Sequence, residues 1–132
     1  MTLINERTQR SLATSVELAD TRRSRRKGLL GRDSMRTDQA MVITPCVAVH
    51  TGFMRFAIDV VFIDRDGRAV HIVQDLQPWR IAASFRARAV IEMPAGRVRA
   101  WDIKLGDRLS LAPCGADLAR CGADLYGPRI GS

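Results

Sequence analysis

The chain has 132 residues, of which 46% are hydrophobic and 27% are charged, and its 21 Lys and Arg residues against 14 Asp and Glu residues give a net charge of +7. A chain of this length forms one domain that buries roughly two thirds of the surface exposed in its unfolded form. The hydrophobic content excludes global disorder, and three cysteines are too few for a miniprotein built on disulfides.

The folded domain is expected to span residues 12–112, with an N-terminal tail at residues 1–11 and a C-terminal extension at residues 113–132. The extension contains a short repeat, CGADLAR followed by CGADLYG, in which Cys114 and Cys121 are seven residues apart. On a helix this spacing separates the two thiols by roughly 10 Å, which is too far for a disulfide. We therefore interpret the repeat as a poorly ordered extension rather than as a metal or redox site.

The first part of the domain is predicted to be a strand followed by a helix. Residues 12–19 alternate loosely between apolar and polar side chains, which favours a strand. Asp20 or Thr21 is expected to cap a helix that runs to about residue 30, because a short polar oxygen accepts the free amide hydrogens of a first turn. Leu29 and Leu30 are the expected inward-facing anchors of this helix.

Two short runs and a hairpin are predicted next. The β-prone runs at residues 40–44 and 46–51 are separated by Pro45, which is tolerated at a strand end or bend. Between the segment 57–63 (AIDVVFI) and the segment 69–76 (AVHIVQDL), residues 64–67 are Asp-Arg-Asp-Gly. That sequence is typical of a turn, with glycine supplying a positive φ. The two segments are therefore expected to pair as a hairpin.

The remaining elements complete a mainly β domain. After a loop that begins at Pro78, the sequence predicts a strand at 87–93, a short helical turn at 98–103 that carries Trp101 into the core, and a last strand at 108–112. Seven short strands with turns every eight to twelve residues are typical of a small β-sandwich or barrel-like fold. The predicted fold is thus a single mainly β domain with one or two short helices.

The positive charge is concentrated in one segment. Residues 22–36 contain seven basic residues and one acidic residue, a net charge of +6 out of the total of +7. Such a segment attracts phosphates and acidic surfaces, but it is also typical of a solvated helix face. It contains no aromatic side chain that could stack on a base. The candidate patch for nucleic acid or an acidic partner consists of Arg22, Arg23, Arg25, Arg26 and Lys27.

Several separated motifs indicate a family. They are A-x-T at 19–21, then Arg26, Gly28, Leu29, Leu30 and Arg32, HTGFMRFAIDVVFIDRDG at 50–67, IEMPAG at 91–96 and LGDRL at 105–109. In this order, over about residues 12–112, they resemble the domain-of-unknown-function family 192 (DUF192). The resemblance implies a mainly β, sandwich-like domain found in prokaryotes, with no established biochemical activity.

Polar residues within apolar segments are the candidate site residues. Asp59 interrupts an apolar strand, and a buried carboxylate must be paired, hydrogen-bonded or functional. Asp59 therefore either meets solvent or caps a neighbouring turn, or it lines a pocket. Glu92 lies between apolar neighbours and could pair with an arginine or transfer protons if its pKa were raised.

Three further residues complete the candidate site. Arg80 follows Trp79, an arrangement that can present a guanidinium to a carboxylate or phosphate, or else place an exposed pair over the edge of the core. His50 ends a predicted strand and is a weaker candidate, because a lone histidine on a strand is more often a packed or surface residue than a ligand.

The leading hypothesis is a binding protein for a small polar or anionic ligand, or for a partner segment, through a pocket formed by Asp59, Arg80, Glu92, His50 and Trp79. The alternatives are binding of nucleic acid or an acidic partner through the basic patch, and an enzyme that uses Asp59 or Glu92 as a general base. Catalytic motifs and complete metal-ligand sets are absent from the sequence, so a non-enzymatic role without cofactor or metal is favoured. A signal peptide and a membrane span are also absent, so a cytoplasmic location is expected.

Overall fold

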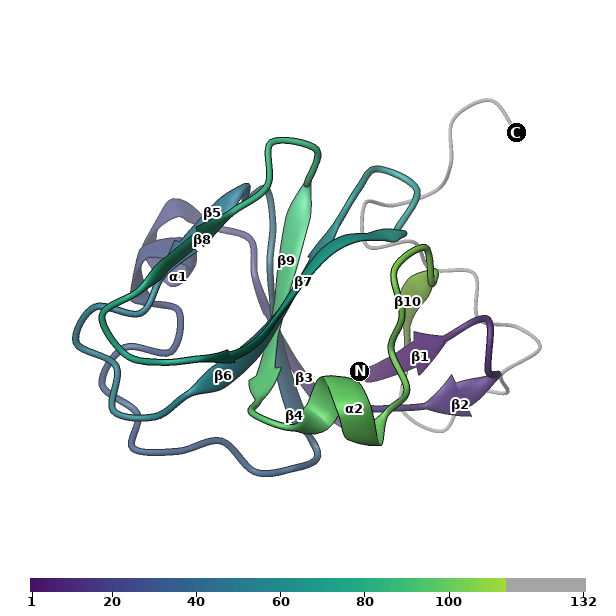
Figure 1. The fold of residues 1–132 in the computed structure, drawn as a ribbon, viewed down its shortest axis with the longest axis horizontal. Helices are drawn as coiled ribbons and strands as arrows, with labels where there is room; N and C mark the ends of the chain where they lie inside the picture. The colour runs from purple at the N-terminus through teal and green to yellow at the C-terminus, as the bar shows by residue number, and fades with distance from the viewer. Residues whose placement is uncertain (114–132) are drawn as a thin grey trace.

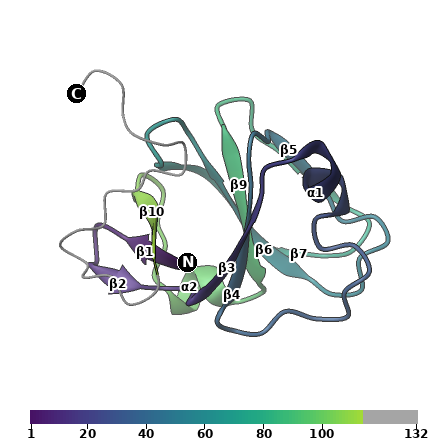
Figure 2. The same ribbon diagram turned by 180° about the vertical axis from the view of Figure 1, so that it is seen from behind.

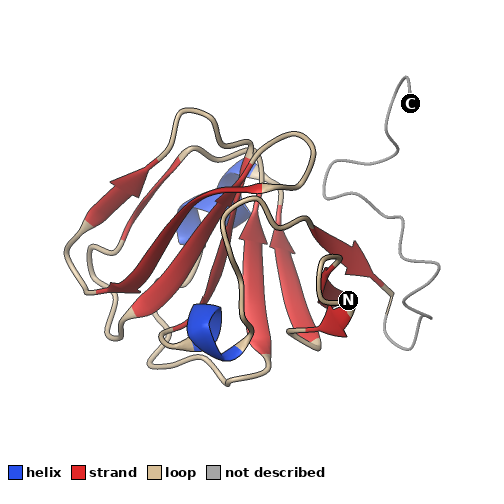
Figure 3. Ribbon diagram, turned by 45° about the vertical axis from the view of Figure 1, so that its right-hand side comes forward, coloured by secondary structure: helices blue, strands red, loops and turns tan. Residues whose placement is uncertain are grey.

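A computed structural model describes residues 1–113 of the chain. Within these residues the protein is mainly β, with ten strands and two short helices, and its sheets do not close into a barrel (Figures 1 and 3). The predicted mainly β fold with one or two short helices is confirmed. The strands are β1 (Thr2–Asn5), β2 (Arg10–Ser11), β3 (Ser15–Ala19), β4 (Gln39–Ile43), β5 (Ala48–His50), β6 (Ile58–Ile63), β7 (Ala69–Leu76), β8 (Ile81–Ala83), β9 (Ala89–Pro94) and β10 (Leu109–Ala112), and the helices are α1 (Arg22–Lys27) and α2 (Arg97–Ala100).

A five-stranded sheet in the order β3-β4-β9-β6-β7 lies at the centre of the molecule. β3 and β4 are parallel, because the segment containing α1 carries the chain back before β4 begins. The other neighbouring strands in this sheet are antiparallel. β6 is buried along its whole length, and β9 along all but its last residue. Both of their faces are covered, which explains why their sequences are nearly continuous in apolar residues instead of alternating.

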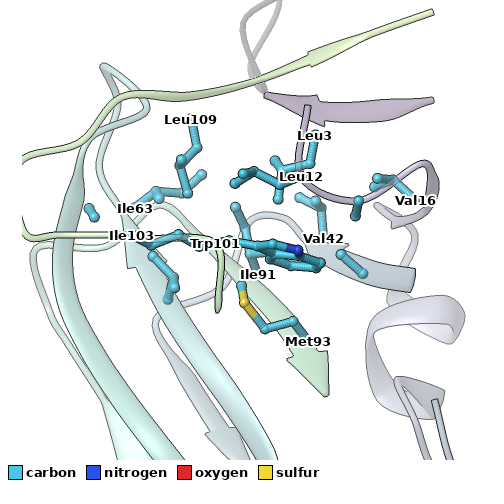
Figure 4. Close-up of a cluster of buried hydrophobic side chains, with 14 of the residues drawn as sticks. Leu3, Leu12, Val16, Val42, Ile63, Ile91, Met93, Trp101, Ile103 and Leu109 are labelled. Atoms are coloured by element: carbon cyan, nitrogen blue, oxygen red, sulfur yellow. The ribbon is translucent and has the colours of Figure 1, made fainter. Parts of the chain in front are cut away.

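Two clusters of buried side chains pack on opposite faces of this central sheet. The first lies against α2 and the β10-β1-β2 sheet, and Trp101 sits among its members, as predicted (Figure 4). The second includes Leu29, Val49 and Met54, and it lies on the side of α1 and the β5-β8 ribbon. Figures 1 and 2 show α1 and β5 at one end of the molecule and β1, β2 and β10 at the other.

The predicted helix begins where expected and ends early. Thr21 caps α1, since its Oγ1 accepts a hydrogen bond from the amide of Ser24 at 3.1 Å while the Ser24 hydroxyl accepts one from the amide of Thr21 at 3.0 Å. Gly28, with a φ of +44°, ends the helix at Lys27 rather than near residue 30. No residue of α1 is buried, so its cations remain accessible, and the helix is attached to the core through Leu29.

The N-terminal residues are part of the fold, which corrects the expectation of a tail at residues 1–11. β1 pairs antiparallel with β10, and Leu3 is fully buried in the first cluster. The side chain of Asn5 donates to Asp107 Oδ2 at 2.8 Å, which adds a second link to the far end of the domain. A strand of four residues has too short a pattern to reveal a partner so distant in sequence.

β8 is a second element that the sequence did not predict. It lies in the expected loop after Pro78 and pairs antiparallel with β5. The β5-β8 ribbon is only three residues long in each strand, so period-two alternation is hardly visible. The cysteine-containing repeat of the expected C-terminal extension lies outside the described residues.

The predicted hairpin is formed by β6 and β7. The Asp64 side chain accepts hydrogen bonds from the backbone amides of Asp66 and Arg68, at 2.9 and 3.0 Å, and thereby holds the turn. Gly67 has a φ of +80°, and a Cβ atom at this position would lie 3.0 Å from the carbonyl oxygen of Leu109. The turn therefore requires glycine for its backbone conformation and for the close approach of β10.

Replacing Gly67 by alanine is expected to lower the free energy of unfolding by about 1 to 3 kcal/mol, because alanine resists a positive φ and its methyl group meets the Leu109 carbonyl. Gly106→Ala is the matched control, since Gly106 has a φ of +88° but no atom lies within 4 Å of its added Cβ. Urea unfolding should show the larger loss for Gly67→Ala. Equal losses in the two variants would show that the close approach of β10 to Gly67 does not affect the free energy of unfolding.

Candidate functional site

Asp59 is fully buried and binds three backbone amides. Its Oδ1 accepts a hydrogen bond from the amide of Asp75 at 2.8 Å, and its Oδ2 accepts from the amides of Gly96 at 3.0 Å and Val98 at 2.9 Å. Gly96 and Val98 lie at the start of α2, so the carboxylate caps this helix and ties it to the central strand. The geometry agrees with the structural alternative for Asp59, the capping of a neighbouring turn.

Asp59 and Glu92 lie on opposite faces of the central sheet. In the pairing of β6 with β9, Asp59 lies opposite Met93, whereas Glu92 lies opposite Val60. Residues directly opposite each other share a face of the sheet. Met93 belongs to the cluster beside α2, and Val60 belongs to the cluster on the α1 side. The expected convergence of Asp59, Arg80 and Glu92 in one pocket is therefore not found.

Trp79 and Arg80 lie in the exposed loop between β7 and β8. The backbone amide of Arg80 donates to Thr51 Oγ1 at 2.8 Å. The Trp79 ring packs edge-on against Phe53, with ring centroids 4.6 Å apart, a contact that the sequence did not predict. Neither Trp79 nor Arg80 lines the cavity that contains Glu92.

Glu92 faces a cavity of about 160 Å³ between α1 and the strands β4, β5 and β9. Two groups of residues that the sequence placed in separate hypotheses, the basic patch and the pair of Glu92 and His50, meet in this cavity. The polar and charged residues of its lining are Arg25, Arg26, Lys27, Cys46, His50 and Glu92. Its apolar lining includes Leu29, Leu30, Ile43, Pro45, Val49 and Met54.

Glu92 is the most unusual residue of the cavity. Glu92 is 4% exposed, and its Oε2 atom has no hydrogen-bond partner among the described residues. Burial raises the pKa of this carboxyl group to about 7, against the opposing effect of the Arg32 charge. Near neutral pH a substantial fraction of Glu92 is therefore protonated and able to donate a hydrogen bond. Buried polar atoms normally have a hydrogen-bond partner, so a ligand or a water molecule is expected to bind Oε2.

Cys46 and His50 come from the chain around β5. The Cys46 thiol donates a hydrogen bond to the carbonyl oxygen of Ala48 at 3.0 Å, and burial raises the pKa of this thiol. It is thus a neutral lining group rather than a reactive thiolate. His50 is exposed, at the rim. Cys46 was not among the candidate residues. The one feature of the sequence that pointed to it is its Cys-x3-His spacing from His50.

A second hollow, of about 350 Å³, lies near β1 and β10, and both of its acidic groups are already paired with arginines of its lining. Arg7 Nε donates to Asp107 Oδ1 at 2.6 Å, and Arg108 lies 3.6 Å from Glu6 Oε2. These contacts join the N-terminal segment to the loop before β10. Within residues 1–113, no group of three or more His, Cys, Asp or Glu residues is arranged to hold a metal ion.

The family model of DUF192, described as an uncharacterized ACR, matches residues 3–111 of the chain. The chain belongs to the DUF192 family. The match includes all of β1 except its first residue, in agreement with the place of that strand in the fold.

Relatives of this DUF192 protein occur in archaea under the name UPF0127. One from Pyrococcus horikoshii is 32% identical over 114 residues, which cover 81% of this chain and 96% of the relative. Another, from Pyrococcus furiosus, is 40% identical over 63 residues, and that match spans about half of each chain, 47% of this one and 53% of the relative.

Two solved structures have the same fold. A crystal structure of a protein of unknown function from Novosphingobium aromaticivorans matches 84% of this chain and 84% of its own chain with a TM-score of 0.76 and 21% identity. A Sinorhizobium meliloti protein, provisionally named a transcription regulator, matches 83% of this chain and 89% of its own with a TM-score of 0.72 and 29% identity. In the described residues, no helix has the length and apolar character needed to cross a membrane.

Proposed function

We propose that this DUF192 protein binds a small organic anion with an apolar body in the cavity beneath α1. The observation that carries the proposal is the meeting of three groups in one cavity: the cations of α1, an apolar wall, and a buried carboxyl group whose Oε2 is without a partner among the described residues. Cavities that bind small molecules combine an apolar lining with a few convergent polar groups.

The cations supply the attraction for an anion. Arg25, Arg26 and Lys27 form the last turn of α1, a helix without acidic residues, and all three line the cavity. Arg26 and Lys27 are exposed, so they are available to an anion that approaches from solvent. Arg25 is partly held, because its Nη1 donates to the Asp20 carbonyl oxygen at 2.9 Å.

The interior of the cavity selects the rest of the ligand. Leu29, Val49 and Met54 favour an apolar body, and the volume of about 160 Å³ suits a ligand with a single aromatic ring, such as benzoate. Protonated Glu92 donates a hydrogen bond to an acceptor on the ligand, whereas ionised Glu92 repels an anion. Binding is therefore expected to weaken as the pH rises through about 7, the pKa of Glu92.

Benzoate is the probe for this proposal, with calorimetric titration of the full chain at pH 6. The variant Arg26→Ala/Lys27→Ala is expected to bind benzoate at least about tenfold more weakly, because both cations line the cavity. Arg22→Ala/Arg23→Ala removes the same charge from the same helix, but neither residue lines the cavity, so a loss of about threefold or less is expected. Equal losses in the two variants would contradict a site in the cavity.

Two further comparisons test the chemistry. Benzyl alcohol has a similar ring but no charge, and it is expected to bind at least about tenfold more weakly than benzoate. In Glu92→Gln the affinity for benzoate should no longer fall between pH 6 and pH 8. Equal affinities for the two compounds, or an unchanged pH dependence in the variant, would refute the roles given to the cations and to Glu92.

A second candidate is binding of nucleic acid or another acidic partner, which the five accessible cations of α1 favour. This alternative predicts that affinity for a single-stranded oligonucleotide falls steeply with salt. It also predicts that the two double variants of α1 lose affinity equally.

A carboxyl group with a pKa of about 7 is also suited to proton transfer, the role that the enzyme alternative gives to Glu92. Asp59, the other candidate base, is engaged by three amides.

A further inference from the structure

We propose that the apolar face formed by Phe53, Trp79 and Ile81 is an anchor that docks this protein on an anionic membrane surface. The proposal is independent of the ligand cavity. It rests on the exposure of these side chains, on the rigid framework that holds them, and on the charge of the segments around them.

The three side chains are large, apolar and exposed. Phe53 is 74% exposed, Trp79 62% and Ile81 78%. The two rings pack against each other with centroids 4.6 Å apart, so they form one apolar surface. Ile81 lies opposite His50 in the β5-β8 ribbon, and both are exposed, whereas Val49, the residue before His50, is buried in the core. Exposed aromatic side chains gathered in this way mark interaction sites.

The backbone holds both rings outward in an unusual conformation. Phe53 and Trp79 have φ values of +62° and +65°, which bulky residues rarely adopt unless the surrounding structure enforces them. The enforcing residue is Thr51, which is fully buried between the two loops. Its carbonyl oxygen accepts from the amide of Met54 at 3.1 Å and from that of Trp79 at 3.0 Å.

The Thr51 hydroxyl completes this framework. It donates to the carbonyl oxygen of Gln77 at 2.6 Å and accepts from the amide of Arg80 at 2.8 Å. One buried residue thus fixes the two loops that carry the aromatic rings. Because the rings are held in place before any partner arrives, little conformational freedom remains to be lost on docking.

The segments that carry this face have a net positive charge, and one surface carboxylate, Asp33, contacts them through its ion pair with Arg55. Residues 44–58 and 76–91, which carry the face, contain no Asp or Glu. Arg80 and Arg86 are exposed within them. The face also adjoins the rim of the cavity beneath α1, since a Cβ on Gly52 would lie 3.3 Å from His50 Nδ1 and 3.7 Å from the Trp79 ring.

An apolar centre carried by segments with a net positive charge matches the anionic surface of a lipid bilayer. Trp and Phe prefer the interface between water and lipid, and arginines pair with anionic headgroups. Ile81 gains from contact with acyl chains but offers no ring on which a base could stack. This difference favours lipid over single-stranded nucleic acid as the occupant.

The test uses the full chain with phosphatidylcholine vesicles, with and without phosphatidylglycerol. Trp79 reports insertion, because Trp101 is buried and its emission is a constant background. Vesicles that contain phosphatidylglycerol are expected to sediment the protein, to shift the Trp79 emission to shorter wavelength, and to quench it when their acyl chains are brominated. Absence of sedimentation, or sedimentation without quenching by the brominated chains, would overturn the proposal.

The variant Phe53→Ser/Ile81→Ser keeps the Trp79 reporter, and its partition coefficient is expected to fall at least about tenfold, since partitioning scales with the apolar area that enters the interface. Leu105→Ser is the matched control: Leu105 is 66% exposed, in the turn between α2 and β10. This control should partition like the wild type. An equal loss in both variants would contradict the assigned face, as would quenching of Trp79 by a single-stranded oligonucleotide in place of vesicles.

Discussion

Asp59→Ala is expected to lower the free energy of unfolding by about 3 to 5 kcal/mol. The substitution leaves the amides of Asp75, Gly96 and Val98 without their buried acceptor, and it removes the cap of α2. Asp59→Asn should be destabilised as well, because its amide group presents N–H donors to backbone N–H groups. Urea unfolding at neutral pH measures both losses.

Asp33→Ala is the control for this experiment. It removes the same charge, but Asp33 is exposed and its contact is an ion pair with Arg55 on the surface. Surface pairs of this kind contribute about 0 to 1 kcal/mol. If Asp59→Ala were as stable as Asp33→Ala and instead lost binding of benzoate, Asp59 would be a ligand residue and its structural role would be refuted.

Glu92 is expected to make the protein less stable as the pH rises, by about 3 kcal/mol between pH 4.5 and pH 8. Burial raises the pKa of its carboxyl group from 4.5 to about 7 in the folded protein, so the folded form holds the proton more tightly than the unfolded chain does. The stabilising contribution is fully present below pH 4.5 and is lost as the pH rises through about 7. Glu92→Gln cannot ionise and lacks this contribution at every pH.

Urea unfolding of the wild type and of Glu92→Gln at pH 4.5, 6 and 8 isolates the effect, because titrations elsewhere cancel in the difference. Glu17→Gln is the control with the opposite sign. The hydrogen bond from Arg32 lowers the pKa of Glu17, so its contribution is present at high pH and lost in acid. A stability difference between wild type and Glu92→Gln that stays constant from pH 4.5 to pH 8 would contradict a buried, mostly neutral carboxyl group.

The parts of the fold that could be predicted are those that depend on residues close together in the sequence. The Asp-Arg-Asp-Gly turn, the Thr21 cap and the inward position of Leu29 each depend on residues close together in sequence, and each is present. β1 could not be predicted, because its partner β10 lies at the other end of the described chain. Three-residue strands such as β8 are too short for a periodic pattern.

The prediction of the candidate site was partly wrong and partly right, and both outcomes depend on how the strands of the central sheet pair. Whether Asp59 and Glu92 share a face depends on the register of β6 against β9, which no local pattern specifies. The meeting of Glu92 with the cations of α1 likewise depends on the sheet order β3-β4-β9, which brings β9 close to the helix that follows β3. The residue types pointed to Glu92 and to the basic patch, but only the topology joins them.

The pKa of Glu92 in the free and ligand-bound protein tests the central claim most directly. A titration of its ¹³C-labelled carboxyl group, followed by NMR with and without benzoate, gives both values. We predict a midpoint at about 7 in the free protein. Benzoate should move it upward, because an anion held in the cavity beneath α1 disfavours the ionised carboxylate. A midpoint near the ordinary value of 4.5, or one that benzoate leaves unchanged, would contradict a buried carboxyl group that contacts the ligand.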